Sequence, residues 1–79
     1  MELNIESIRE RVEAAGYIFM SSELFDNNRR IEIRLAKNRL SRTFGVRGAN
    51  YPDIFKSDAE INEAVSNLLQ HADNYYGKI

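Results

Sequence analysis

The sequence predicts an α+β fold, in which a helix, three strands and a second helix follow one another in a single small domain, residues 1–79. Two stretches with apolar residues at spacings of three and four lie near the ends of the chain, and three alternating apolar and polar runs lie between them. The gaps between these runs are short, which favours a three-stranded antiparallel meander. Both amphipathic helices must bury their apolar stripes, and we expect them to pack together on one face of the sheet.

The first helix is predicted over residues 4–15. Asn4 is a suitable N-cap, and apolar residues recur from Ile8 to Val12 and on to the next turn. Gly16 favours a stop at the C-terminal end.

The three strands are predicted over residues 17–25, 30–36 and 39–47. The middle run, with Ile31 and Ile33 alternating against arginines and a glutamate, has the clearest strand pattern. We expect it to be the central strand, because two-residue turns at Asn27-Asn28 and Lys37-Asn38 would join sequential neighbours. The pairs that these turns imply include Leu24 with Ile31, Met20 with Leu35, and Leu35 with Leu40.

The predicted register assigns each side chain to a face of the sheet. The side chains expected against the helices are Ile18, Met20, Leu24, Ile31, Ile33, Leu35, Leu40, Phe44 and Val46. Arg42 is out of place, since its parity puts it on this apolar side. Either its long side chain reaches out to solvent from an edge strand, or a bulge near Gly45 shifts the register.

Residues 48–56 are predicted to form a loop, and residues 58–76 the last helix. Ser57 as N-cap with Glu60 three residues later forms a capping box. Along this helix we expect Tyr75 in the core and Tyr76 at its rim.

Charge is unevenly distributed along a chain whose formal net charge is −1. Residues 28–50 carry seven basic residues and one acid, whereas residues 1–27 carry six acids and two bases, and residues 51–79 five acids and two bases. Such segregation can create a local field over one surface.

The register places much of this positive charge on the open face of the sheet, beside aromatic residues. The residues of this candidate binding face are Arg30, Arg34, Arg39, Arg47, Tyr17, Phe19 and Phe25. Arginine and tyrosine are favoured contacts for an acidic protein surface. The same groups suit phosphates and unpaired bases, although the sequence pI of 5.8 lies far below the values above ~9 typical of nucleic-acid binders. A third interpretation is ordinary surface chemistry, in which Arg30 and Arg34 pair with Glu32.

The first strand suggests a different role. The run Tyr17–Ser22 has no charged residue and lies on a predicted sheet edge, where it could pair with another chain. Two-fold pairing there would make a homodimer with a continuous six-stranded sheet.

The sequence offers little for catalysis. It has no cysteine, its single histidine, His71, falls just outside the apolar arc of the last helix, and no phosphate-binding loop or metal-ligand cluster is recognisable. We therefore expect no enzymatic activity, no cofactor and no metal. The sequence has no recognisable secretory leader and no apolar run long enough to span a bilayer. We therefore expect a cytoplasmic protein.

The order of elements is similar to that of the double-stranded RNA-binding domain. This resemblance implies RNA as a ligand. That family carries a basic cluster at the start of its last helix, where this chain reads KSDAEINEA, and a Gly-Pro loop where this chain reads DNNR, so the RNA-binding surface of the family does not carry over to these residues. In size and lack of cysteine the chain also resembles small phage proteins that block host defences, including some anti-CRISPR inhibitors.

The sequence thus predicts a small binding module whose open face engages an acidic protein surface, as an inhibitor or adaptor. Nucleic-acid binding and structural homo-oligomerisation are the alternatives.

Overall fold

The computed structural model describes residues 4–48, 55 and 57–78, and its elements follow in the predicted order. The helices are α1 (Ile5–Ala14) and α2 (Asp58–Tyr76), and the strands are β1 (Ile18–Phe25), β2 (Arg30–Lys37) and β3 (Leu40–Arg47). β2 lies between β1 and β3, and it pairs antiparallel with both. The predicted α+β meander is confirmed, and each element begins and ends within one residue of its predicted bounds.

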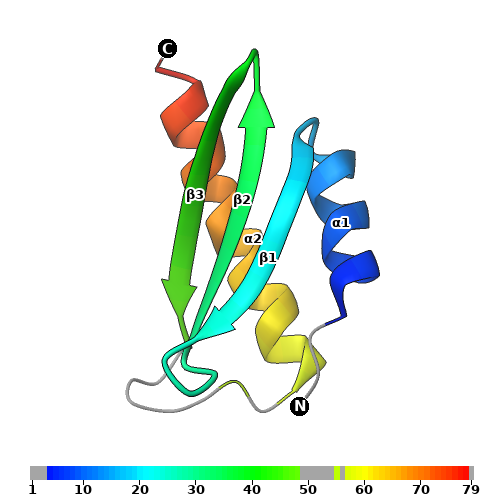
Figure 1. Cartoon of the computed structure of the whole chain (residues 1–79), viewed down its shortest axis with the longest axis vertical. Coiled ribbons are helices and arrows are strands. Elements are labelled where there is room, and N and C mark those ends of the chain that lie inside the picture. Colours follow the sequence, from blue (N-terminus) through cyan, green and yellow to red (C-terminus); the bar gives the residue numbers. More distant parts are fainter. Residues whose placement is uncertain (1–3, 49–54, 56, 79) are drawn as a thin grey trace.

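Both helices lie on one side of the sheet. Figure 1 shows α2 running the length of the molecule behind β2 and β3, with α1 beside β1. The opposite side of the sheet faces the viewer in Figure 1 and is covered by neither helix. We call it the open face.

One apolar core joins the two layers. Ile31, Ile33 and Leu35 of β2 are fully buried, as the alternation predicts, and they meet apolar side chains of both helices. The buried residues of the helices and of the segment before α2 are Ile8, Val12, Phe55, Ile61, Ala64, Val65, Leu68, Ala72 and Tyr76. Burial of these side chains supplies the main driving force for the fold.

The predicted helix caps are present. The Asn4 side chain accepts a hydrogen bond from the Ser7 N–H at 3.1 Å, and Ser57 Oγ accepts one from the Glu60 N–H at 3.3 Å. Each bond satisfies a backbone donor that a helix start leaves unpaired.

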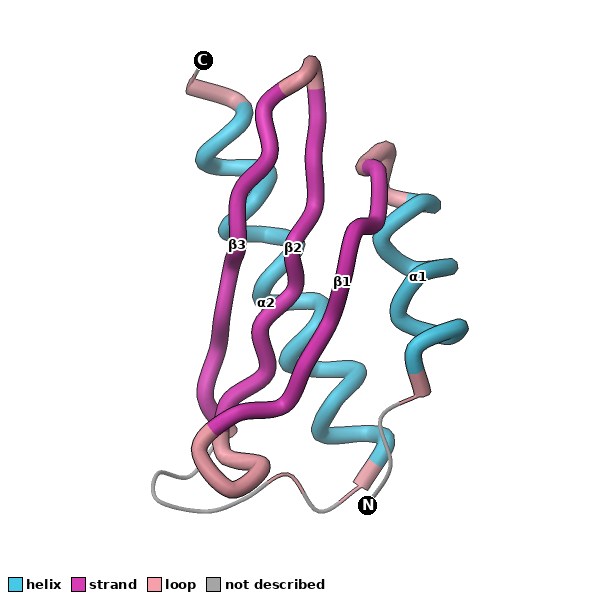
Figure 2. Tube along the Cα trace, viewed as in Figure 1, coloured by secondary structure: helices cyan, strands magenta, loops and turns pink. Residues whose placement is uncertain are grey.

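β1 contains a bulge that the sequence did not reveal. Its pairing with β2 is regular from Phe25 to Ser21 and resumes at Phe19, which leaves Met20 as an extra residue. The interruption is visible as a step near the upper end of the β1 tube in Figure 2. One extra residue reverses the alternation beyond it.

The bulge overturns the predicted orientation of four residues at the start of β1. Tyr17 is 4% exposed and Phe19 packs against the core, so both lie on the helix side and not on the open face. Ile18 and Met20, predicted against the helices, are 66% and 49% exposed.

The turn between β2 and β3 is one residue later than predicted. Asn38 and Arg39, not Lys37 and Asn38, occupy it, with φ values of 54° and 67°. The first position of a tight hairpin turn requires the left-handed conformation. Asparagine tolerates this conformation better than lysine does. Lys37 therefore stays in the strand.

This shift changes the partners across β2 and β3 without changing the faces. Leu35 pairs with Arg42 and not with Leu40, but the displacement is two positions in register, so each side chain keeps its predicted side. Arg42 lies on the helix side, as its parity predicted. Pairing is regular through Gly45, and the alternative of a bulge near that glycine is wrong.

The turn between β1 and β2 contains residues 26–29 and is longer than the predicted two residues. Asp26, Asn27 and Asn28 all have positive φ, and Leu24 still pairs with Ile31 as predicted. The Phe55 N–H donates to the Asn28 carbonyl at 2.8 Å, which ties this turn to the segment before α2. Most of the predicted loop 48–56 lies outside the described residues.

The bulge makes a direct prediction about stability. Tyr17→Ala should lower the free energy of unfolding by about 3 kcal/mol or more, because a large buried ring is lost. Ile18→Ala, the matched truncation one residue away, should lower it by about 1 kcal/mol or less, because this side chain is exposed. Urea denaturation followed by circular dichroism measures both, and the reverse ranking would show that β1 is not bulged.

Candidate binding surface

Arg30 lies flat on the open face and is paired. Its Nε donates to Glu32 Oε2 at 2.8 Å. Glycine at position 45, opposite Glu32, leaves room for this arrangement, since a Cβ there would lie 2.3 Å from Arg30 Nη2. The interpretation of Arg30 as part of an ordinary surface ion pair is therefore the one the geometry favours.

Arg47 is paired as well. Its Nη1 lies 2.8 Å from Asp26 Oδ2 across the end of the sheet, and both side chains are about half exposed. The hydrogen bond and charge of Arg47 lower the pKa of Asp26. This ion pair joins the end of β3 to the β1–β2 turn.

The open face as a whole is balanced in charge. Arg34 also lies there, in cross-strand pairing with Ser21 and Thr43, but Glu23 and Glu32 stand opposite each other on the neighbouring strands. A hollow of about 210 Å³ crosses this face, lined by Ser21, Glu23, Phe25, Glu32, Arg34 and Thr43. The strands give this face three arginines and two glutamates, and Asp26 of the turn pairs with Arg47, so acids offset most of the positive charge expected on the open face.

Three of the predicted site residues lie elsewhere. The bulge turns Tyr17 and Phe19 to the helix side, where Arg9 of α1 lies over the Phe19 ring at 5.5 Å. Arg39 is in the β2–β3 turn and not on a strand. Of the predicted aromatics, Phe25 alone remains on the open face, 41% exposed.

The positive charge collects at the β2–β3 turn. Residues 33–48 contain five basic residues and no acid. Lys37, Arg39 and Arg42 lie in the turn or within three residues of it, and Arg34 lies on the open face four residues before Asn38. We call this group of four the basic hairpin end: Arg34, Lys37, Arg39 and Arg42. It lies at the same end of the molecule as the C-terminal end of α2, at the top of Figure 1.

Two of these cations, Arg42 and Lys37, make cation–π contacts with aromatic rings. The Arg42 guanidinium lies 4.3 Å from the centre of the Tyr75 ring and 5.8 Å from that of Phe44, and Lys37 Nζ lies 5.2 Å from that of Tyr17. Each such contact is worth roughly 0.5–1 kcal/mol at an exposed site. The stacking orients Arg42, which remains exposed on the helix side of the sheet.

The rings form one cluster with the end of α2. Tyr17 and Tyr76 lie 5.5 Å apart, Phe44 and Tyr75 5.8 Å, and the two adjacent tyrosines 5.1 Å, with tilted or edge-to-face geometry. The Tyr76 hydroxyl donates to the Leu40 carbonyl at 2.7 Å. These contacts hold the hairpin end against α2.

The burial of the two terminal tyrosines is the reverse of that predicted. Tyr76 is buried and Tyr75 is half-buried. Both are at helical spacing from the buried Ala72, so the pattern alone could not choose between them. Tyr76 is selected because its ring meets Tyr17 and its hydroxyl reaches Leu40.

The buried phenols are held in their neutral form. Burial raises the pKa of Tyr17, and its hydrogen bond to Asp73 and the charge of that carboxylate raise it further. Burial also raises the pKa of Tyr76. Both hydroxyls therefore act as donors, Tyr17 to Asp73 and Tyr76 to the β3 backbone.

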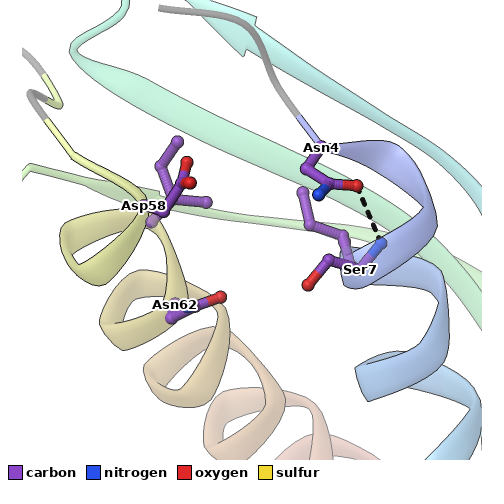
Figure 3. A pocket seen from close by; sticks show the side chains of 6 residues that line it. Asn4, Ser7, Asp58 and Asn62 are labelled. Carbon is purple, nitrogen blue, oxygen red and sulfur yellow. Dashed lines mark hydrogen bonds between the residues drawn. The ribbon is translucent and has the colours of Figure 1, made fainter.

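A second hollow, of about 90 Å³, lies where the two helices begin. Figure 3 shows Asn4, the N-cap of α1, and Ser7 of α1 facing Asp58 and Asn62 of α2 across it. The Asn4 side chain is engaged in capping α1, and an acid in the first turn suits the α2 dipole. The Asn4 and Asp58 side chains in this pocket are therefore explained by their roles at the first turns of the two helices.

The predicted homodimer edge, Tyr17–Ser22, is the outer strand of the sheet but is interrupted by Met20. Bulges of this kind disrupt regular edge-to-edge pairing. Pairing between two copies stays a prediction.

In residues 4–48, 55 and 57–78 no group of three metal-ligating side chains comes together, and neither described helix has the length and apolar character that a bilayer crossing needs. Comparison with protein-family models gave no match, and comparisons with curated proteins and with solved structures gave no significant match.

The basic hairpin end could not be predicted from the sequence, because it depends on the position of the β2–β3 turn. The one signal was Arg42, whose parity put a charge on the apolar side. A charge in that position is explained by an aromatic residue of α2, Tyr75, on which the Arg42 guanidinium stacks.

The raised pKa of Tyr17 predicts a loss of stability in alkali. A tyrosine whose pKa is higher in the folded than in the unfolded state contributes stability fully below the ordinary value of about 10, and this is lost as the pH rises beyond that value. The free energy of unfolding should therefore fall more steeply above about pH 10 in the natural protein than in Tyr17→Phe. Parallel curves from urea titrations would contradict the raised pKa of Tyr17, which burial and the hydrogen bond to Asp73 together produce.

Proposed function

We propose that the protein is a non-enzymatic binding module that engages an acidic protein surface through the basic hairpin end. This proposal keeps the class of partner predicted from the sequence and moves the contact from the open face to the β2–β3 turn. It is supported by the charge balance of the open face and by the concentration of cations around the turn.

The conformation of Arg39 is the observation that carries the proposal. Five non-glycine residues of the described chain have positive φ, and the other four are aspartate or asparagine, which tolerate it. A long side chain at φ 67° costs roughly 1–2 kcal/mol, and glycine would suit this turn better. Within the described residues the Arg39 side chain makes no hydrogen bond or ion pair that would offset that cost.

Arg42 adds a pre-oriented group beside it. Stacking on Tyr75 restricts the guanidinium before any partner arrives. A planar guanidinium binds a carboxylate through two parallel N–H donors, and a restricted side chain loses less entropy on binding. Arg39 and Arg42 together could hold two carboxylates of a partner.

The balance of charge over the molecule favours a protein over nucleic acid. The exposed sides of the helices carry acids, including Glu10, Glu13 and Glu63, and the net charge is −1. A long polyphosphate would meet this opposing charge, whereas a local acidic patch would meet only the hairpin end. Binding there could block the partner's surface or bridge it to another protein, the two roles of inhibitor and adaptor.

Replacing Arg39 by glycine separates stability from binding. Arg39→Gly should raise the free energy of unfolding by about 1 kcal/mol, because the left-handed conformation is relaxed, and should weaken binding to polyglutamate at least fivefold. Asn38→Gly is the matched control, because it relaxes the same turn and keeps the charge. Urea denaturation and fluorescence anisotropy with labelled polyglutamate at low salt measure the two quantities.

The same assay distinguishes the alternatives. If Arg39→Gly and Asn38→Gly bind polyglutamate equally well, Arg39 has no role in binding and the proposal fails. If a single-stranded oligonucleotide of equal charge binds more tightly, with an affinity that falls steeply with salt, the partner is nucleic acid.

A further inference from the structure

We infer that the acidic partner binds in extended conformation and adds a fourth strand to the free edge of β3. The inference rests on the proposed function and specifies the form of its ligand. Strand addition provides affinity through main-chain hydrogen bonds and leaves selection to the flanking side chains.

The phase of the β2–β3 ladder shows which backbone groups point outward. In an antiparallel pair, hydrogen-bonded and non-hydrogen-bonded positions alternate. The Gly48 N–H donates to the Arg29 carbonyl at 2.8 Å, which fixes this position as a hydrogen-bonded one. The N–H and C=O groups of Ser41, Thr43 and Gly45 then point away from β2, along the outer edge.

This edge is suited to pairing, and the opposite edge is not. β3 is regular over its eight residues, and within the described part of the chain no strand or helix pairs with its outer side. On the other side of the sheet the extra residue Met20 breaks the regular spacing of β1. A bulge protects an edge from pairing, and its absence from β3 leaves that edge open to a partner.

The cations next to this edge would select an acidic strand. Arg42 lies on the helix side of β3. On the open face, Arg34 is directly across from Thr43, whose short side chain leaves a path from the Arg34 guanidinium to an added strand. An added strand would therefore meet a guanidinium on each of its faces, so it should carry acids on both.

A second copy of β3 fits this edge poorly. Two-fold pairing about Thr43 would bring Arg39 of one copy near Arg47 of the other and set the two Arg42 side chains diagonally on one face, without an acid on either strand. Like charges in cross-strand pairs destabilise a sheet. The charge thus favours an acidic segment of another protein over self-association.

An N-methylated peptide tests the main-chain contacts separately from the charges. The probe is an eight-residue peptide of glutamate and threonine in equal number, with acids on both faces of the strand. The comparison peptide has the same sequence with alternate backbone nitrogens methylated, in each of the two phases. Calorimetry should show binding of the probe, and methylation in the phase that faces β3 should weaken it at least tenfold. Amide exchange at Ser41, Thr43 and Gly45 should slow when the probe binds.

Other outcomes overturn the inference in distinguishable ways. If both methylated peptides bind as well as the probe, and Arg42→Ala weakens all three, strand addition is wrong and charge recognition by the hairpin end stands. If the probe fails to bind while polyglutamate binds in an Arg39-dependent manner, strand addition is wrong but the proposed function stands. If neither ligand binds, both the inference and the proposed function fail. Light scattering of the free protein at high concentration gives a further check, because a dimer lost in Thr43→Pro, which removes an outward N–H, would assign the β3 edge to self-pairing.

Discussion

The contact between the end of α2 and the β2–β3 hairpin is the interaction on which the candidate surface depends. The Tyr76 hydroxyl bonds to the Leu40 carbonyl beside the turn, and the Tyr76 ring packs on Tyr17. A two-stranded hairpin that extended beyond its sheet would be only marginally stable by itself. Held by the helix, the same hairpin can present Arg39 and Arg42 in fixed positions.

The bulge in β1 is linked to this contact. Only because Met20 is an extra residue does Tyr17 turn to the helix side, where it meets Tyr76, Lys37 and Asp73. The same irregularity makes β1 a poor edge for strand pairing. One local feature thus supports the aromatic cluster at one end of the sheet and leaves β3 as the regular edge.

The elements could be predicted from the sequence because they depend on local signals. Periodicity and caps at Asn4 and Ser57 located both helices, and alternation located the strands. The facing of Tyr17 and Phe19 could not be predicted, because a bulge leaves alternation intact on each side and carries no residue signature here. The choice between Tyr75 and Tyr76 was likewise decided by contacts across the fold, and not by spacing along the helix.

The candidate site was predicted only in part, for a related reason. Composition correctly placed the excess positive charge in the middle third of the chain, but it could not show that Arg30 and Arg47 are paired with Glu32 and Asp26. Ion pairs depend on register and turn geometry, and the β2–β3 turn lies one residue later than its sequence suggests. The residues left without such partners in the described chain, Arg34, Arg39 and Arg42, became apparent only from the three-dimensional arrangement.

The central claim is that the hairpin end is a rigid, pre-organised surface. Backbone ¹⁵N relaxation of residues 37–42 tests it most directly. If α2 holds the hairpin as described, the order parameters at Asn38 and Arg39 should be about 0.85, as in the strands. Values below about 0.6 at the turn and the flanking positions would show a mobile hairpin and would contradict the account.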